Sequence, residues 1–285
     1  MALTTPAATA RAAVRAAAGF GIGCTDPVVL ADGANVIVHL APSPVVAKVA
    51  ASTAVVRPDA AAGLQRELDV VLFLAGAGAP VMPPSAEVPA ATHRADGQVM
   101  SFWTYLPPAG PSRPDAATLG SMLRDLHAAL RSYPGAAPWL APLGDIESFL
   151  ARPRAGVSDA DAADLADAFE RLTAELGSAA DHGQVLHGDA GAGNLMATAA
   201  GWIWHDFEDV CSGPAAWDLA PSVASRFIDS SRVLAAYGDA VDPRQLEICR
   251  QLRLLNLTVW YSVYAERLPE CRERAAELVA SWRAQ

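Results

Sequence analysis

The chain has 285 residues, of which 52% are hydrophobic and 18% charged. This balance predicts a globular protein with a sizeable core and excludes a disordered one, and the length leaves room for two modest domains. The net charge of −10 and the pI of about 5.0 argue against nucleic acid as a partner, because phosphate backbones are bound by clustered lysine and arginine.

The cysteines give no sign of a metal or redox site. Cys24, Cys211, Cys249 and Cys271 are far apart and form no CxxC pair. They are typical of reduced thiols in a cytoplasmic protein. The charge-free run 70–86 is broken by glycine and proline, so we expect no membrane-spanning helix and no membrane partner.

The first fifty residues predict one helix and three strands. The Ala-rich stretch 6–18 is typical of a helix. The β-branched runs 28–30 and 36–40 flank the turn residues 31–35, a pattern that predicts a hairpin. A third strand is predicted at 45–49.

Further along, the pattern changes from mixed to mainly helical. A helix is expected to open at Arg57-Pro58-Asp59 and run to about Ala75, because its apolar residues recur at helical spacing. A strand is predicted at 98–106, and the Pro- and Gly-rich run 107–111 is typical of a linker. Two short strands are predicted near 195–197 and 202–204, between helices at 114–132, 144–151, 158–181, 214–229, 230–238 and, with breaks, 243–282.

The most informative stretch runs from His187 to Asp209 and reads HGDAGAGNLMATAAGWIWHDFED. Phosphoryl transfer from ATP needs a carboxylate beside the attacking hydroxyl and oxygen ligands that hold Mg²⁺ on the phosphates. Asp189 is the candidate catalytic base, and Asn194 and Asp206 are candidate Mg²⁺ ligands. Glu208 is either a supplementary metal ligand or a residue that faces solvent or an arginine. The structural alternatives are a helix or turn cap for Asp189, a turn residue for Asn194 and a strand-end cap for Asp206.

The single lysine is a second indication. The chain has 20 arginines and one lysine, Lys48, at the end of the apolar run Val45–Val49. A compact ammonium is not equivalent to a planar guanidinium at a phosphate site, so the retained lysine favours phosphate binding. The alternative is a strand-edge residue that guards against aggregation.

These residues resemble the aminoglycoside phosphotransferase family, the small-molecule branch of the protein-kinase-like fold. His187-Gly188-Asp189, followed by Asn194, is similar to its catalytic loop, and Asp206-Phe207-Glu208 is similar to its metal-binding segment. The run from Gly213 to Ala220 is similar to the element that follows.

The resemblance extends back over Asp32–Asn35, Lys48 and Glu67, and covers most of residues 30–222. It implies an α+β, bilobal protein-kinase-like fold. The expected lobes are a small strand-rich N-lobe that binds the nucleotide, 1–106, and a larger, mainly helical C-lobe, 107–285, with the catalytic loop and the acceptor site.

The resemblance also implies the phosphate contacts. Lys48 would bridge the α- and β-phosphates, with Glu67 holding its ammonium in place. The turn that contains Gly33 and Asn35 would bring backbone N–H groups over the phosphates, although hairpin geometry explains the same residues.

The strand Met100–Leu106 occupies the position of the family's hinge, whose backbone would read the adenine edge. Trp103 and Tyr105 are its candidate contacts. Three other polar residues are expected to be structural: His187 braces the loop, His127 packs within a helix, and Asp218 caps a helix and ties down the catalytic loop.

The predicted function is an ATP- and Mg²⁺-dependent kinase that moves the γ-phosphate to a hydroxyl of a small molecule, such as an aminoglycoside-like or amino-alcohol acceptor. We expect a cytoplasmic monomer or homodimer. One alternative is a nucleotide-binding regulator or pseudokinase without turnover. The other is a protein kinase, against which Gly188 stands where the HRD loop has arginine and only seven positions separate Asp206 from Gly213.

Overall fold

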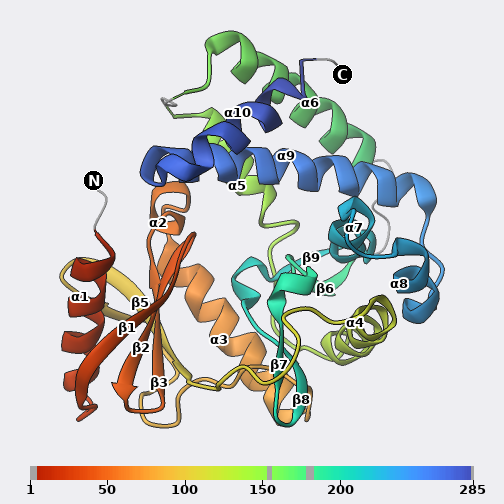
Figure 1. Ribbon diagram of the computed structural model, residues 1–285. Coiled ribbons are helices and arrows are strands. Elements are labelled where there is room, and N and C mark those ends of the chain that lie inside the picture. Colours follow the sequence, from red (N-terminus) through yellow and green to blue (C-terminus); the bar gives the residue numbers. More distant parts are fainter. Residues whose placement is uncertain (1–4, 153–155, 178–182, 284–285) are drawn as a thin grey trace. The chain divides into compact units, whose positions relative to one another are not determined.

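The computed structural model describes residues 5–152, 156–177 and 183–283 (Figure 1). The chain divides into two compact units. The first comprises Met1–Pro111 and Met196–Glu208, and the second comprises Ser112–Leu195 and Asp209–Gln285. The assignment of nucleotide binding to 1–106 and of the acceptor site to 107–285 stays a prediction.

The centre of the first unit is a five-stranded antiparallel sheet in the order β1-β2-β3-β5-β4. The predicted hairpin is confirmed, although both of its strands extend beyond their apolar runs, because backbone pairing does not require apolar side chains. The strands are β1 Cys24–Asp32, β2 Asn35–Pro42, β3 Val45–Ala50, β4 His93–Ala95 and β5 Gln98–Thr104.

Three helices accompany the sheet. Helix α1, Pro6–Ala18, is the predicted Ala-rich helix. Helix α3, Ala60–Gly76, begins later than predicted, because Asp59 is its N-cap and accepts a hydrogen bond from the Ala62 backbone N–H. The short helix α2, Thr53–Val56, was not predicted, since one turn is too short for a periodic signal.

The two faces of the sheet carry different helices. Val45, Ala47 and Val49 of β3 join a buried cluster with the alanines of α1. Side chains alternate along a strand, so Lys48 points to the opposite face. On that face, Ala50 packs against Leu64 of α3. The strand period therefore directs the lysine towards α3, the helix that carries Glu67.

A second hairpin completes the first unit. Strands β7, Leu195–Thr198, and β8, Gly201–Trp204, confirm the two short strands predicted there. The Trp204 N–H donates to the Pro80 carbonyl at 2.8 Å, and the Met82 N–H donates to the Trp204 carbonyl at 2.8 Å. These bonds fix the end of β8, two residues before Asp206.

The second unit is mainly helical, as predicted. A small antiparallel pair, β6 Gln184–Leu186 with β9 Cys211–Gly213, was not predicted because each strand has only three residues. Residues 178–181, the end of one predicted helix, lie outside the described part of the chain. The helices are α4 Ala116–Leu130, α5 Leu143–Leu150, α6 Asp159–Gly177, α7 Ala216–Ala224, α8 Ser230–Tyr237, α9 Pro243–Arg267 and α10 Arg272–Ala280.

Helix α9 is the central element of the second unit. It packs against α5, α6, α7 and α10 (Figure 1). Its side chains at Leu252, Leu255, Val259 and Val263 are buried and recur at three- and four-residue spacing. The face of α9 towards α7 also supplies a cation to the site described below.

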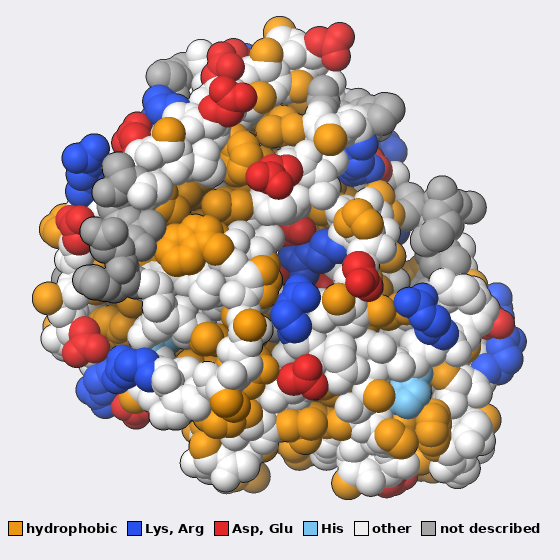
Figure 2. All heavy atoms as spheres, turned by 180° about the vertical axis from the view of Figure 1, so that it is seen from behind, with side chains coloured by type: hydrophobic (Ala, Val, Ile, Leu, Met, Phe, Trp, Pro, Cys, Tyr) orange, Lys and Arg blue, Asp and Glu red, His pale blue; other side chains and the backbone are white. Residues whose placement is uncertain are grey.

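The surface is mixed in character. On the face drawn in Figure 2, acidic and basic side chains are interspersed with hydrophobic ones. Within the described residues, no helix combines the length and the apolar composition needed to cross a bilayer.

We expect Leu68→Ala to lower the free energy of unfolding by about 2–5 kcal/mol, because it removes buried apolar atoms from α3 and leaves a cavity. Leu72 lies one turn later on the same helix and is 47% exposed. Leu72→Ala should change stability by less than about 0.5 kcal/mol. Chemical denaturation of both variants measures the difference, and equal losses would contradict the burial assigned to α3.

Candidate functional site

Lys48 lies among three carboxylates in the first unit. Its Nζ donates to both oxygens of Glu67, at 3.0 and 2.8 Å, and to Asp206 Oδ1 at 2.5 Å. Glu208 Oε2 is 3.3 Å away. The predicted pair of Lys48 with Glu67 is therefore present, and both side chains are buried.

The electrostatics keep this lysine charged. Burial alone would lower the pKa of Lys48, but the carboxylates of Asp206, Glu67 and Glu208 outweigh it and hold the pKa well above its ordinary value. A permanent ammonium is thus fixed on the α3 face of the sheet.

Asp206 is placed by its backbone and by its neighbour. Its φ of +64° lies in the left-handed region, which aspartate tolerates better than most residues. The next N–H, that of Phe207, donates to Glu67 Oε1 at 3.0 Å. Glu67 therefore holds both Lys48 and the chain beside Asp206. The Asp206 side chain remains 45% exposed, in contrast to the buried lysine.

Glu208 is held by donors rather than directed to solvent. Its Oε2 accepts from Asn35 Nδ2 at 2.5 Å, and its Oε1 lies 3.3 Å from Arg57 Nη1. These contacts connect Glu208, which follows β8, to Asn35 at the start of β2 and to Arg57 at the C-terminal end of α2. Its role as a supplementary metal ligand stays a prediction.

The other candidate nucleotide contacts take part in packing within the first unit. The Gly33 N–H closes the β1–β2 turn by donating to the Asn35 carbonyl at 3.1 Å. The Trp103 indole is buried and donates to Ser101 Oγ at 2.9 Å. The Tyr105 ring stacks on His39, with centroids 3.7 Å apart. Their contacts with a nucleotide stay predictions.

The candidate catalytic loop belongs to the second unit and follows β6. Gly188 has a φ of +88°, and a Cβ there would lie 1.8 Å from the Asp209 carbonyl oxygen. Only glycine fits this position, because both the conformation and the space exclude a side chain. The loop therefore passes directly against the backbone at Asp209.

Asp218 ties down this loop, as the sequence predicted, but the predicted helix cap is wrong, because the N-cap of α7 is Ala215 and Asp218 lies within the first turn. Its fully buried carboxylate accepts from the backbone N–H of His187 at 2.8 Å and of Gly188 at 2.9 Å. His127 Nε2 lies 3.0 Å from the same carboxylate, and its Nδ1 lies 2.9 Å from the Tyr237 hydroxyl. Burial would raise the pKa of Asp218, but the hydrogen bonds of His127 and His187 lower it, so the carboxylate stays ionised.

Asp189 and Asn194, the candidate base and metal ligand, are brought together within this loop. Asn194 Nδ2 donates to the Asp189 carbonyl at 2.7 Å and to Asp189 Oδ2 at 2.9 Å. The backbone N–H of Asp189 donates to His187 Nδ1 at 3.3 Å, which confirms the bracing role of that histidine. The amide oxygen of Asn194 is the atom that a metal would use.

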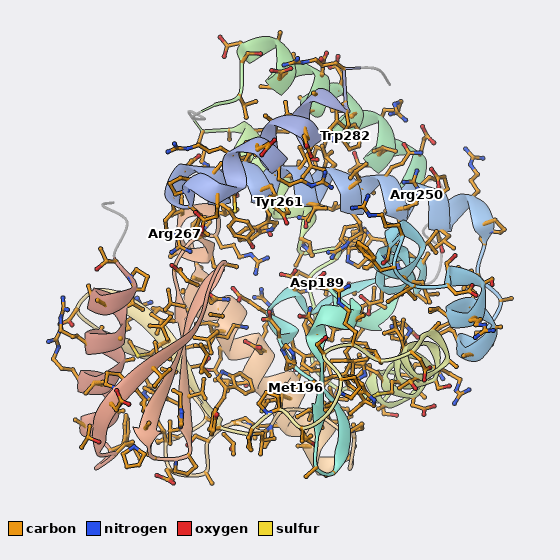
Figure 3. All side chains as sticks on the ribbon, in the orientation of Figure 1. Asp189, Met196, Arg250, Tyr261, Arg267 and Trp282 are labelled. Carbon is orange, nitrogen blue, oxygen red and sulfur yellow. The ribbon has the colours of Figure 1, made fainter. Side chains whose placement is uncertain are left out.

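The sequence interpretation missed Arg253. Its guanidinium pairs with Asp189 Oδ1 and donates to the Gly188 carbonyl at 3.1 Å. Figure 3 shows Asp189 beneath the part of α9 that lies between Arg250 and Tyr261. One signal in the sequence could have identified it. Arg253 lies four residues after Cys249 and three before Asn256, both buried, so helical spacing places it on the buried face of the predicted helix.

Comparison with known proteins gives a family and a fold. The sequence model of the phosphotransferase enzyme family matches residues 30–252. A comparison with curated proteins gives no match. The solved structures that match include three small-molecule kinases or phosphotransferases.

An amicoumacin kinase in complex with AMP-PNP, Ca²⁺ and Ami has a TM-score of 0.69 and 13% identity, over 95% of this chain and 92% of that one. The choline kinase LicA from Streptococcus pneumoniae has a TM-score of 0.63 and 13% identity, over 95% and 99%. An aminoglycoside-3'-phosphotransferase of type VIII has a TM-score of 0.60 and 21% identity, over 86% and 98%. Identities this low show a shared fold, and the predicted protein-kinase-like fold is confirmed.

Gly188→Ala should destabilise the protein by about 1–3 kcal/mol more than Gly238→Ala. Both glycines have left-handed backbones, with φ of +88° and +84°, so both variants carry the same conformational cost of about 1–2 kcal/mol. Only Gly188 also faces a backbone clash, since a Cβ at Gly238 meets nothing within 4 Å. Equal unfolding midpoints for the two variants would contradict the close approach to Asp209.

Proposed function

Because the chain belongs to the phosphotransferase enzyme family, we propose that it is a kinase that uses MgATP to phosphorylate a hydroxyl of a small molecule. Family membership confirms the predicted enzyme class. One observation supports the use of MgATP. The buried ammonium of Lys48 donates hydrogen bonds to Glu67 and to the half-exposed carboxylate of Asp206. A fixed cation beside a half-exposed carboxylate suits a metal–phosphate group.

The residues of the first unit fit a nucleotide and its metal. Within the described residues, no group of three or more His, Cys, Asp and Glu side chains could hold a metal ion alone. Mg²⁺ in kinases takes one or two protein oxygens and completes its shell with phosphate oxygens and water, so a sparse donor set is expected. The buried Asn35 Oδ1 also has no hydrogen-bond partner among the described residues.

In the proposed mechanism Lys48 binds the phosphates, and Asp206 and Asn194 are the Mg²⁺ ligands. Mg²⁺, when bound, neutralises charge on the phosphates. Asp189 orients the acceptor hydroxyl and accepts its proton as the new P–O bond forms. The bond between the γ-phosphorus and the β–γ bridging oxygen of ATP breaks in the same transfer, and ADP is the leaving group. Asn194 keeps the Asp189 carboxylate in place through its amide nitrogen, and its amide oxygen would be the metal ligand.

The acceptor is proposed to be a small hydroxyl compound that carries amines, such as an aminoglycoside-like molecule or an amino alcohol. Support comes from the three similar structures, whose names specify amicoumacin, choline and aminoglycosides as their substrates. The net charge of −10 is compatible with a cationic acceptor.

The direct test is acceptor-dependent release of ADP from MgATP across a panel of aminoglycosides, amino alcohols, macrolides, homoserine and sugars. We expect at least one acceptor to give turnover, and Asp189→Asn to lower kcat for it by at least about 100-fold, because the general base is lost. The variant should still gain stability from MgATP, about 2.7 kcal/mol at 100 times Kd. Nucleotide binding without turnover for any acceptor would instead support a nucleotide-binding regulator.

Lys48→Arg tests the phosphate role of the single lysine. The variant keeps the charge, but a planar guanidinium does not fit a pocket that closes around a compact ammonium. Loss of one charge-assisted hydrogen bond, about 1.5–3 kcal/mol, corresponds to a decrease in kcat/KM for MgATP of about tenfold to a hundredfold. Arg94→Lys, an exposed swap on β4, is the control and should leave kcat/KM unchanged. A fully active Lys48→Arg enzyme would show that the lysine only stabilises the fold.

A further inference from the structure

The carboxylate of Asp189 is held from both sides. Asn194 Nδ2 bonds to Oδ2 at 2.9 Å, and the guanidinium of Arg253 pairs with Oδ1. A carboxylate oxygen has two lone-pair directions, so each oxygen keeps one acceptor site after these contacts. The side chain is 41% exposed, which leaves room for an acceptor hydroxyl to approach.

The guanidinium of Arg253 is also held by groups other than Asp189. Its side chain is only 13% exposed, and its guanidinium lies over the Trp217 ring, 5.3 Å from the centroid. The same guanidinium donates to the Gly188 carbonyl, which also accepts from Trp217 Nε1 at 2.8 Å. One planar fork therefore bonds both to the backbone just before the aspartate and to its carboxylate.

The surroundings of Arg253 favour its charged form. Burial would lower its pKa, but the carboxylates of Asp189, Asp209 and Asp218 outweigh burial and raise it. A neutral side chain of the same length would leave these three carboxylates without their shared cation.

The backbone of the loop does not need Arg253 to keep its course. Asp218 already accepts from the N–H groups of His187 and Gly188, and Trp217 already donates to the Gly188 carbonyl. The contact that Arg253 alone adds is the one to Asp189 Oδ1. Its distinctive effect therefore concerns the orientation of the carboxylate and not the path of the chain.

We propose that Arg253 is a positioning residue for phosphoryl transfer. It fixes the rotation of the Asp189 carboxylate, together with Asn194 on the other oxygen, so that the remaining lone pairs face the acceptor hydroxyl. This inference rests on the proposed kinase function, with Asp189 as the base. Misplacing a reacting group by about 1 Å can reduce the rate roughly 100-fold, so a carboxylate held by Asn194 alone would lower the rate of phosphoryl transfer.

The test compares Arg253→Met, Arg253→Lys and the control Arg250→Met in the ADP-release assay. Arg250 lies one turn earlier on α9, where it pairs with Glu247 at the surface, and its loss should leave kcat unchanged. We expect Arg253→Met to lower kcat roughly 100-fold while KM for MgATP stays within about twofold, because Arg253 bonds to Gly188 and Asp189, whereas the proposed MgATP ligands are Lys48, Asn194 and Asp206. Arg253→Lys should be intermediate, since a single ammonium cannot reproduce the two-pronged contact.

Chemical rescue separates positioning from folding. Added guanidinium or methylguanidinium should restore part of the kcat of Arg253→Met and none of that of Asp189→Asn. If Arg253→Met does not fold, Arg253→Lys carries the test through its kcat and KM. An unchanged kcat in Arg253→Met or Arg253→Lys would overturn this inference and leave the proposed function standing. So would a loss of kcat that follows the fraction of folded protein and is not rescued by guanidinium. An inactive wild type with every acceptor would overturn the proposed function and this inference together.

Discussion

The candidate catalytic loop depends on one buried charge, the carboxylate of Asp218. No lysine or arginine of the described chain is in direct contact with it, and it is satisfied by two backbone N–H groups of the loop and by His127. A buried carboxylate is stable only when its oxygens are fully hydrogen-bonded, so the loop and the carboxylate fix each other. Through His127 and Tyr237, helices α4 and α8 are joined to the same network.

The first unit holds a cation on regular secondary structure, and the second holds a carboxylate on an irregular loop. In the first unit, a strand and a helix hold a cation, Lys48, among carboxylates. In the second, an irregular loop holds a carboxylate, Asp189, against an arginine. The alternation of side chains along a strand directs the lysine to its carboxylates, whereas the loop is held by the glycine at 188, by the buried acid Asp218 and by the donors Trp217 and Arg253.

Sequence reasoning succeeded where a local period or a compact motif carried the information. The resemblance to the phosphotransferase family predicts the pair of Lys48 with Glu67, and Asp189 and Asn194 are close in sequence. It failed for Arg253 and for the bond between Asn35 and Glu208, which join residues 64 and 173 positions apart. Such partners are decided by tertiary packing, and one sequence contains no spacing that reveals them. The three-residue strands β6 and β9 were missed for a related reason, since they form only because the chain returns beside itself.

Glu67 gives the first unit a mechanical link between two chain segments. One carboxylate, carried by helix α3, binds both the Lys48 ammonium and the Phe207 N–H beside Asp206. A displacement of α3 would therefore move the partner of the lysine and the anchor of the aspartate segment in the same step. The position of helix α3 is thus coupled to both groups through a single carboxylate.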